Sequence, residues 1–309
     1  MARAVTVMST WRRGHPPLIT VFSPNRAQRQ QHIALSARKP AAPGIDPGGP
    51  SPNCPGGLDA LPCLAMAIIA ALIGLLVGHT VELSLDRSYS DSPLGGPRTR
   101  CPTCRSPIRA ADLLPVAGYF LHFGRCPDCH QRLPLRALLL APASAICFAL
   151  AALATDDWGA TVLTGIFCAI FLALLFTDLE RRLIPNRIVY PAALLAMAIS
   201  WAWPDRSAAQ VFAGGGLAFA IMLLMYIISM GRFGFGDVKM ATLMGLAAGF
   251  PAMTVGLFFT AISAGLVALA LLLTRIVRRG EYMPYGPFIA LGAIVSLLWG
   301  AAIIDWYTG

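Results

Sequence analysis

Long uncharged runs alternate with short charged segments from residue 60 to the C-terminus. About 20 apolar residues are needed to cross the roughly 30 Å of hydrocarbon in a bilayer, and most of the runs have about that length. They are 60–81, 137–154, 158–177, 188–204, 207–231, 240–274 and 282–304. The pattern therefore predicts membrane helices, one for each run except 240–274, which is too long for a single helix.

A Gly-Phe-Pro sequence at 249–251 is a natural break within the long run. Division at this point predicts a short helix near 238–250 and a full one near 252–274. The chain is thus expected to be an all-α integral membrane protein with about eight transmembrane segments.

The composition agrees with a membrane protein. Hydrophobic residues make up 56% of the chain and charged residues only 13%, whereas a soluble domain carries about 25% charged residues. This excludes an ordinary cytosolic enzyme, a disordered chain and a coiled coil. The net charge of +9 would suggest nucleic acid binding in a soluble protein, but in a membrane protein such an excess more often sets the orientation.

The placement of the basic residues predicts the orientation. Alternate loops, beginning with 82–136, contain 16 of the 24 Lys and Arg residues, whereas the other loops contain only Arg206. By the positive-inside rule the first set is expected in the cytoplasm, which places both chain ends outside. The lipid bilayer is the expected environment, and no nucleic acid partner is predicted. The seven basic residues of the segment 1–60 are not explained by this rule.

The segment 1–60 differs from the rest of the chain. It is rich in Pro, Gly, Ser and Arg and lacks an apolar period, so it is expected to be a disordered tail. A later start such as Met66 is the alternative, in which case this segment is not translated. The predicted organisation is a tail at 1–60, a first helix at 61–81, a loop domain at 82–136 and a membrane-embedded domain at 137–309.

The loop 82–136 contains the paired motifs Cys101-Pro-Thr-Cys104 and Cys126-Pro-Asp-Cys129. Two such turns each present two thiolates to one tetrahedral ion, so Cys101, Cys104, Cys126 and Cys129 are predicted to bind a structural zinc. An insertion this small has little core, and the metal would supply much of its folding energy. Disulfides and a redox motif are the alternatives. Disulfides are rare on a cytoplasmic face, and no thioredoxin-like strand–helix–strand context surrounds either motif.

Two of the few acids lie at the same predicted membrane face. Asp178 ends the third span, and Asp237 opens the short sixth segment. Two carboxylates held together cannot both ionise easily, so one can take a proton from water while the other donates to a carbonyl oxygen. This is the chemistry of aspartic proteases. The alternative is that each acid is an interfacial carboxylate paired with a base such as Arg181, Arg182 or Lys239.

Glycines precede the second acid in Gly234-Phe-Gly236-Asp237-Val-Lys239. Because glycine lacks a Cβ, a substrate backbone could approach closely at Gly234 and Gly236. We therefore include these glycines and Lys239 in the predicted substrate-binding side of the site.

Taken together, Gly234-x-Gly236-Asp237, the sequence Asp-Leu-x-Arg-x-Leu-Ile-Pro-Asn that starts at Asp178, and the paired cysteine motifs resemble the bacterial prepilin peptidases. These are membrane aspartic proteases of the GxGD kind. The similarity covers about residues 64–305 and extends to Asp112-Leu-Leu-Pro-Val and to Pro284-Tyr-Gly-Pro-Phe.

The resemblance implies that Asp178 and Asp237 form the catalytic dyad, in the bacterial inner membrane with the active site facing the cytoplasm. Members of the family cleave the basic leader of type IV prepilins and of type II secretion pseudopilins after a glycine. Many also methylate the new N-terminus with S-adenosylmethionine. Here Gly78-His-Thr-Val-Glu-Leu replaces the usual Gly-x-Phe-Leu-Asn-Val, and a usual Glu early in the second span is missing. The sequence therefore predicts proteolysis and leaves methylation open.

Two other functions fit parts of the pattern. A proton- or cation-coupled transporter could use the same aspartates, but transporters usually place such acids near the bilayer midplane and show internal repeats. We find neither feature in the sequence. A noncatalytic zinc-bearing scaffold is the other alternative, which a measured peptidase activity would exclude. The sequence does not determine an oligomeric state or the particular prepilins.

Overall fold

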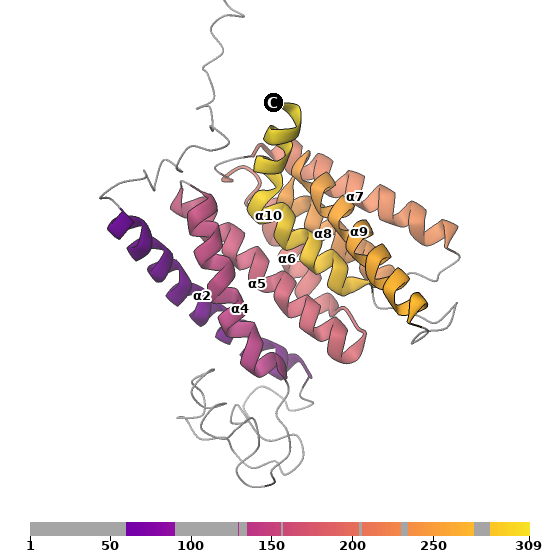
Figure 1. The fold of residues 1–309 in the computed structure, drawn as a ribbon, viewed down its shortest axis with the longest axis horizontal. Helices are drawn as coiled ribbons and strands as arrows, with labels where there is room; N and C mark the ends of the chain where they lie inside the picture. The colour runs from indigo at the N-terminus through magenta and orange to yellow at the C-terminus, as the bar shows by residue number, and fades with distance from the viewer. Residues whose placement is uncertain are drawn as a thin grey trace, which may run out of the picture. The chain divides into compact units, whose positions relative to one another are not determined.

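The computed structural model describes residues 60–89, 129, 135–155, 157–203, 206–229, 234–274 and 285–309. All the regular structure in these residues is helical (Figure 1). The eight helices are α2 (Ala60–Tyr89), α4 (Leu135–Ala154), α5 (Trp158–Arg181), α6 (Asn186–Ala198), α7 (Ala208–Ile228), α8 (Phe235–Ala248), α9 (Ala252–Leu273) and α10 (Gly286–Thr308). The predicted all-α class is confirmed. The predicted tail 1–60 lies outside the described residues except for Ala60.

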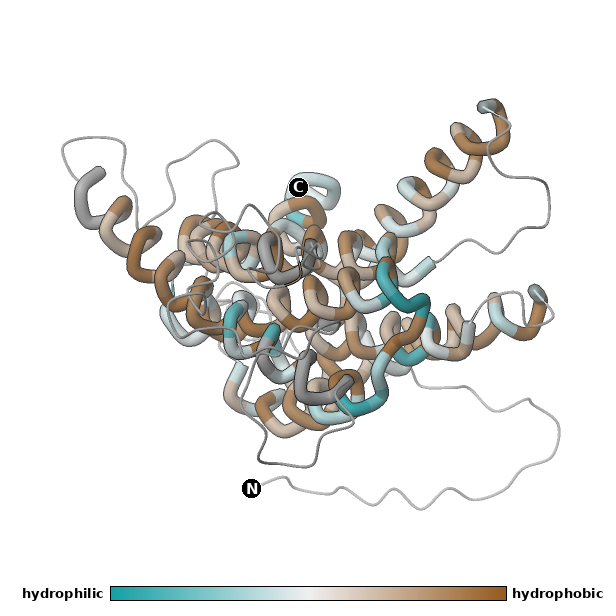
Figure 2. The backbone as a smooth tube through the Cα atoms, turned by 90° about the horizontal axis from the view of Figure 1, so that it is seen from below, coloured by the Kyte–Doolittle hydropathy of each residue, from teal (hydrophilic) through white to brown (hydrophobic). Residues whose placement is uncertain are grey.

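Five of the helices, α2, α5, α7, α9 and α10, are long and apolar enough to cross a membrane. Large hydrophobic side chains are also exposed on them, including Leu76 (67%), Phe258 (68%) and Leu273 (74%). Figure 2 shows hydrophobic residues along most of the coloured helical tube, with hydrophilic positions confined to short stretches. Such apolar exteriors are typical of a surface that faces lipid rather than water. The chain is therefore a membrane protein.

The other three helices are shorter. The apolar part of α4 covers Leu139–Ala154, while α6 has 13 residues and α8 has 14. At 1.5 Å per residue α6 and α8 are only about 20 Å long. The expectation of a full span at 188–204 is wrong, because α6 ends at Ala198 and the chain then turns. This turn buries Trp203, whose ring lies 5.6 Å from that of Phe167 in α5.

The first helix is longer than expected. It continues beyond residue 81 to Tyr89, so residues 82–89 of the predicted loop domain are helical. The rest of the predicted zinc-binding insertion lies outside the described residues, apart from Cys129 and the start of α4.

The predicted division of the long run 240–274 is confirmed. The helix α8 ends at Ala248, and α9 begins at Ala252. Gly249 between them has a φ of 71°, a conformation that favours glycine. Arg206, in the connection between α6 and α7, also contacts the end of α8, because its guanidinium donates a hydrogen bond to the Ala247 carbonyl oxygen. The same guanidinium lies 4.4 Å from the centre of the Trp203 ring.

Glycines allow several helix pairs to pack closely. A Cβ added to Gly245 of α8 would lie 2.7 Å from the Cβ of Ala218 in α7, and one on Gly256 of α9 would lie 3.0 Å from the Gly292 carbonyl oxygen of α10. A Cβ on Gly74 of α2 would similarly clash with the backbone of α4. Small residues at contacts are typical of membrane helices, where close backbone approach replaces the hydrophobic driving force.

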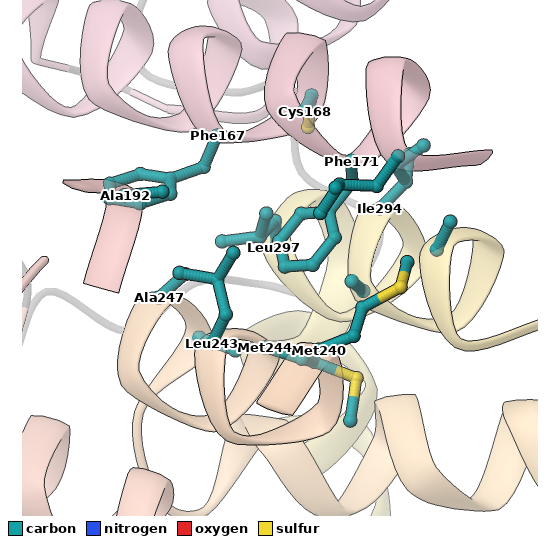
Figure 3. Packing of buried hydrophobic residues seen from close by; sticks show 14 of the residues in the cluster. Phe167, Cys168, Phe171, Ala192, Met240, Leu243, Met244, Ala247, Ile294 and Leu297 are labelled. Carbon is teal, nitrogen blue, oxygen red and sulfur yellow. The ribbon is translucent and has the colours of Figure 1, made fainter. Parts of the chain in front are cut away.

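The main core lies where α5, α8 and α10 meet. In Figure 3, Phe171 of α5 lies beside Leu297 of α10 and faces α8, whereas Phe167 of α5 lies beside Ala192 of α6. All four side chains are buried. Since α10 packs against both α5 and α8, this core fixes the helices that carry Asp178 and Asp237.

Candidate active site

Asp178 lies in the last turn of α5 and is buried, with 5% of its surface exposed. The helix ends at Arg181, and Arg182 adopts a left-handed conformation with a φ of 54°. Its N–H donates to the Asp178 carbonyl oxygen at 2.8 Å, a typical helix C-cap. Pro185 then disfavours helix at the residue before it and precedes the first residue of α6. The helix therefore ends three residues after Asp178, and α6 begins at Asn186.

Asp237 lies in the first turn of α8 and is 4% exposed. One oxygen of its carboxylate, Oδ2, accepts a hydrogen bond from the Gly234 N–H at 3.2 Å. This N–H is one of the groups that a helix N-terminus leaves without an intrahelical acceptor. The positive end of the helix dipole also stabilises a negative charge at this position. The first turn of α8 thus anchors the Asp237 carboxylate.

The two carboxylates lie at the same end of the helix bundle. The Asp178 charge acts on the Asp237 carboxylate, and the consecutive residues Tyr285 and Gly286 are near Asp237 and Asp178, respectively. Asp178 is also attracted by the guanidinium of Arg182. Its Oδ2 atom is buried and has no hydrogen-bond partner among the residues that the structure describes. Glu180, two residues from Asp178, is exposed.

The start of α10 contacts the site, which the sequence reasoning missed. A Cβ on Gly286 would lie 2.5 Å from Asp178 Oδ2, so only glycine leaves room for that carboxylate. Tyr285 precedes it and is close enough to Asp237 to be affected by its charge. Burial raises the pKa of the Tyr285 phenol, and the nearby Asp237 carboxylate raises it further. The sequence Pro284-Tyr-Gly-Pro-Phe was the available signal, but it did not indicate which helices the motif would meet.

Gly236 and Lys239 have contacts within the chain itself. A Cβ on Gly236 would lie 3.2 Å from the Cδ1 atom of Ile184, so glycine here lets α8 pack on the connection between α5 and α6. The Lys239 Nζ atom donates to Asn186 Oδ1 at 3.0 Å. These contacts neither require nor exclude a substrate, and the substrate-approach role of Gly234, Gly236 and Lys239 stays a prediction.

Of the four predicted zinc ligands, only Cys129 is among the described residues, where it is half-buried. Cys101, Cys104 and Cys126 lie outside them. In the described parts of the chain no three His, Cys, Asp or Glu residues are grouped to hold a metal ion. The zinc site therefore stays a prediction.

Two family models match the chain. Residues 165–269 match the type IV leader peptidase family, a segment that includes both Asp178 and Asp237. Residues 72–155 match the bacterial peptidase A24 N-terminal domain, which includes all four cysteines of the paired motifs.

Proteins with similar sequences have the same name, prepilin leader peptidase/N-methyltransferase. The protein of Bacillus subtilis (strain 168) is 26% identical over 245 residues, which cover 78% of this chain and 98% of that protein. The protein of Pseudomonas putida is 29% identical, covering 76% and 91%, and that of Aeromonas salmonicida (strain A449) is 27% identical, covering 80% and 95%. No solved structure matches the chain. With both matched segments and both aspartates in place, the chain belongs to the type IV leader peptidase family of bacterial prepilin peptidases.

Proposed function

We propose that this peptidase is a membrane-embedded aspartic endopeptidase that cleaves the basic leader of type IV prepilins and of type II secretion pseudopilins. The observation that carries the proposal is the burial of Asp178 and Asp237 at one end of the bundle, within electrostatic reach of each other. The names of the relatives support the substrate class.

The proposed mechanism follows from two carboxyl groups that share one proton. The ionised member takes a proton from water, and the protonated member donates a hydrogen bond to the scissile carbonyl oxygen. Asp237 is held by the Gly234 N–H, whereas Asp178 Oδ2 has no partner among the described residues. That oxygen atom can therefore accept a hydrogen bond from a water molecule, or donate one to the substrate when it is protonated. The proton is a property of the pair, so neither residue is assigned one role.

We place this site at the cytoplasmic face of the bacterial inner membrane. The basic residues Arg181, Arg182, Arg187 and Lys239 are near the helix ends that carry the aspartates. Exposed aromatic side chains lie at the opposite ends of the helices, at Trp158, Trp201, Trp306 and Tyr307. Basic residues on the inner side and aromatic residues at an interface are typical of membrane proteins. In this arrangement α6 and α8 are short membrane-embedded helices that complete the eight segments.

A transporter is not favoured. Both aspartates lie at helix ends, whereas transporter sites are built near the bilayer midplane. The similar proteins are also named as peptidases.

Methylation of the new N-terminus by S-adenosylmethionine is a second candidate activity, because the relatives' names include it. The departures at Gly78–Leu83 and in the second span bear mainly on this activity. Proteolysis and methylation are therefore to be measured separately.

Mass spectrometry of a prepilin incubated with the purified enzyme tests both activities. We expect the substrate to lose its leader at a glycine, with or without S-adenosylmethionine. With the cofactor, an added methyl group would establish the second activity, and its absence would limit the enzyme to proteolysis. A prepilin that stays intact with wild-type enzyme, while a known prepilin peptidase cuts it, would contradict the proposed function.

The zinc prediction concerns the purified protein without substrate. We expect about one zinc per chain, measured by elemental analysis, because four thiolates complete a tetrahedral site. The double variant Cys101→Ser/Cys126→Ser should lose this zinc. Cys54→Ser, in the predicted tail, is the matched control and should keep it. Equal zinc content in the double variant and the wild type would refute the site.

A further inference from the structure

Lys239 lies two residues after Asp237 and is held by groups of its own chain. Its Nζ atom donates to Asn186 Oδ1 at 3.0 Å. It also lies 5.1 Å from the ring centre of Tyr190 and 5.1 Å from that of Phe235. An ammonium at this distance from an aromatic face is attracted to it. Since Asn186 and Tyr190 belong to α6, the Lys239 side chain links α8 to α6.

A second contact lies on the other side of Asp237. Gly236 packs against Ile184, which belongs to the short connection between α5 and α6. The residues that flank Asp237 are therefore both in contact with the segment 184–186. This segment begins six residues after Asp178, directly beyond the cap that Arg182 forms on α5.

The two aspartates are thus coupled by a short route. Asp178 and Asn186 are joined by only seven intervening residues of the chain. Within this stretch Ile184 contacts Gly236, and Asn186 itself contacts Lys239, so the connection is packed against the start of α8. Carboxyl groups that share a water and a proton must hold their separation closely, since a misplacement of about 1 Å can reduce a rate about 100-fold. A side chain that fixes this turn would act on catalysis without contacting the substrate.

We propose that Lys239 is a positioning residue. Its contacts with Asn186 and Tyr190 hold the start of α8 against α6, and this keeps the Asp237 carboxyl group correctly placed relative to that of Asp178. The kinetic part of this inference rests on the proposed function. That function also argues against the competing role in substrate binding, because a basic leader would be repelled by a lysine ammonium. A positioning role has no such conflict.

Kinetics on a prepilin substrate separate the two roles. Lys239→Met and Asn186→Ala should each lower kcat about 10- to 100-fold and leave KM within about twofold of wild type. Asn186→Asp should retain nearly full kcat, because a carboxylate oxygen accepts the same hydrogen bond. Arg187→Met is the matched control, since it removes an exposed neighbouring charge and should change neither constant. An increase in KM with unchanged kcat for Lys239→Met, or an equal loss in Arg187→Met, would overturn the proposal.

Thermal unfolding in detergent tests the link without any activity. Each single variant, Lys239→Met and Asn186→Ala, should lower Tm, and the double variant should lower it no further than the larger single effect. Residues that share one contact are not additive in this way, whereas independent residues are. Additive shifts would refute the link even in an active enzyme. If wild-type protein does not cleave prepilin, the proposed function is wrong. The unfolding experiment then still tests the contact between Lys239 and Asn186.

Discussion

Asp178→Asn and Asp237→Asn are each expected to abolish prepilin cleavage, with a loss of at least about 1,000-fold in kcat. Asparagine has nearly the same shape as aspartate, but it can neither take a proton from water nor donate the proton of a carboxylic acid. Both side chains are almost fully buried, and the two carboxylates repel each other when ionised. Removal of one charge should therefore leave membrane insertion and Tm unchanged or raise Tm.

The measurement is cleavage of a prepilin by detergent-solubilised enzyme, with Tm determined on the same preparations. Glu180→Gln is the matched control, because it neutralises an exposed acid two residues from Asp178 and should retain activity. Near wild-type cleavage by either asparagine variant would remove that residue from the dyad.

Gly286→Ala is expected to reduce kcat about 100-fold or more while affecting stability little. The new Cβ would lie 2.5 Å from Asp178 Oδ2 and 2.8 Å from its Cγ, far inside van der Waals contact. The clash is with a short side chain that can rotate away, so the fold can accommodate the methyl group. Rotation of that carboxyl group, however, breaks its geometry with Asp237.

Gly265→Ala is the control for this variant. It lies in α9, where an added Cβ would meet no atom within 4 Å, and alanine favours a helix more than glycine does. We expect Gly265→Ala to keep wild-type kcat. Unchanged cleavage by Gly286→Ala would show that the start of α10 does not constrain the dyad, and a large fall in its Tm would indicate a defect in folding instead.

The membrane character and most of the helices were predictable from the sequence, and so was the break at Gly249. These features depend on local properties. A run of apolar residues enters lipid whatever its neighbours are, and a helix satisfies its own backbone hydrogen bonds there. The placement of Asp178 and Asp237 at one face followed in the same way, because alternating spans return to the same side of the membrane.

The length of α6 could not be predicted in this way. The run 188–204 is uncharged throughout, but its helix ends at Ala198, and the turn that follows is stabilised by packing of Trp203 against Phe167. This stabilisation comes from a residue of another helix, and a hydropathy pattern does not contain it.

The sequence by itself determined that this chain is a helical membrane protein, which acids are candidates for catalysis, and which family it resembles. Only the tertiary structure decided what surrounds those acids: Gly286 against Asp178, Tyr285 within range of the Asp237 charge, and the contact of Lys239 with Asn186. The physical reason is that the surfaces of these helices are all similarly apolar, so the sequence pattern does not show which helix packs against which. In lipid, one apolar helix face packs about as well as another. Which helices pack together therefore depends on small residues at their contacts and on a few polar contacts between distant segments.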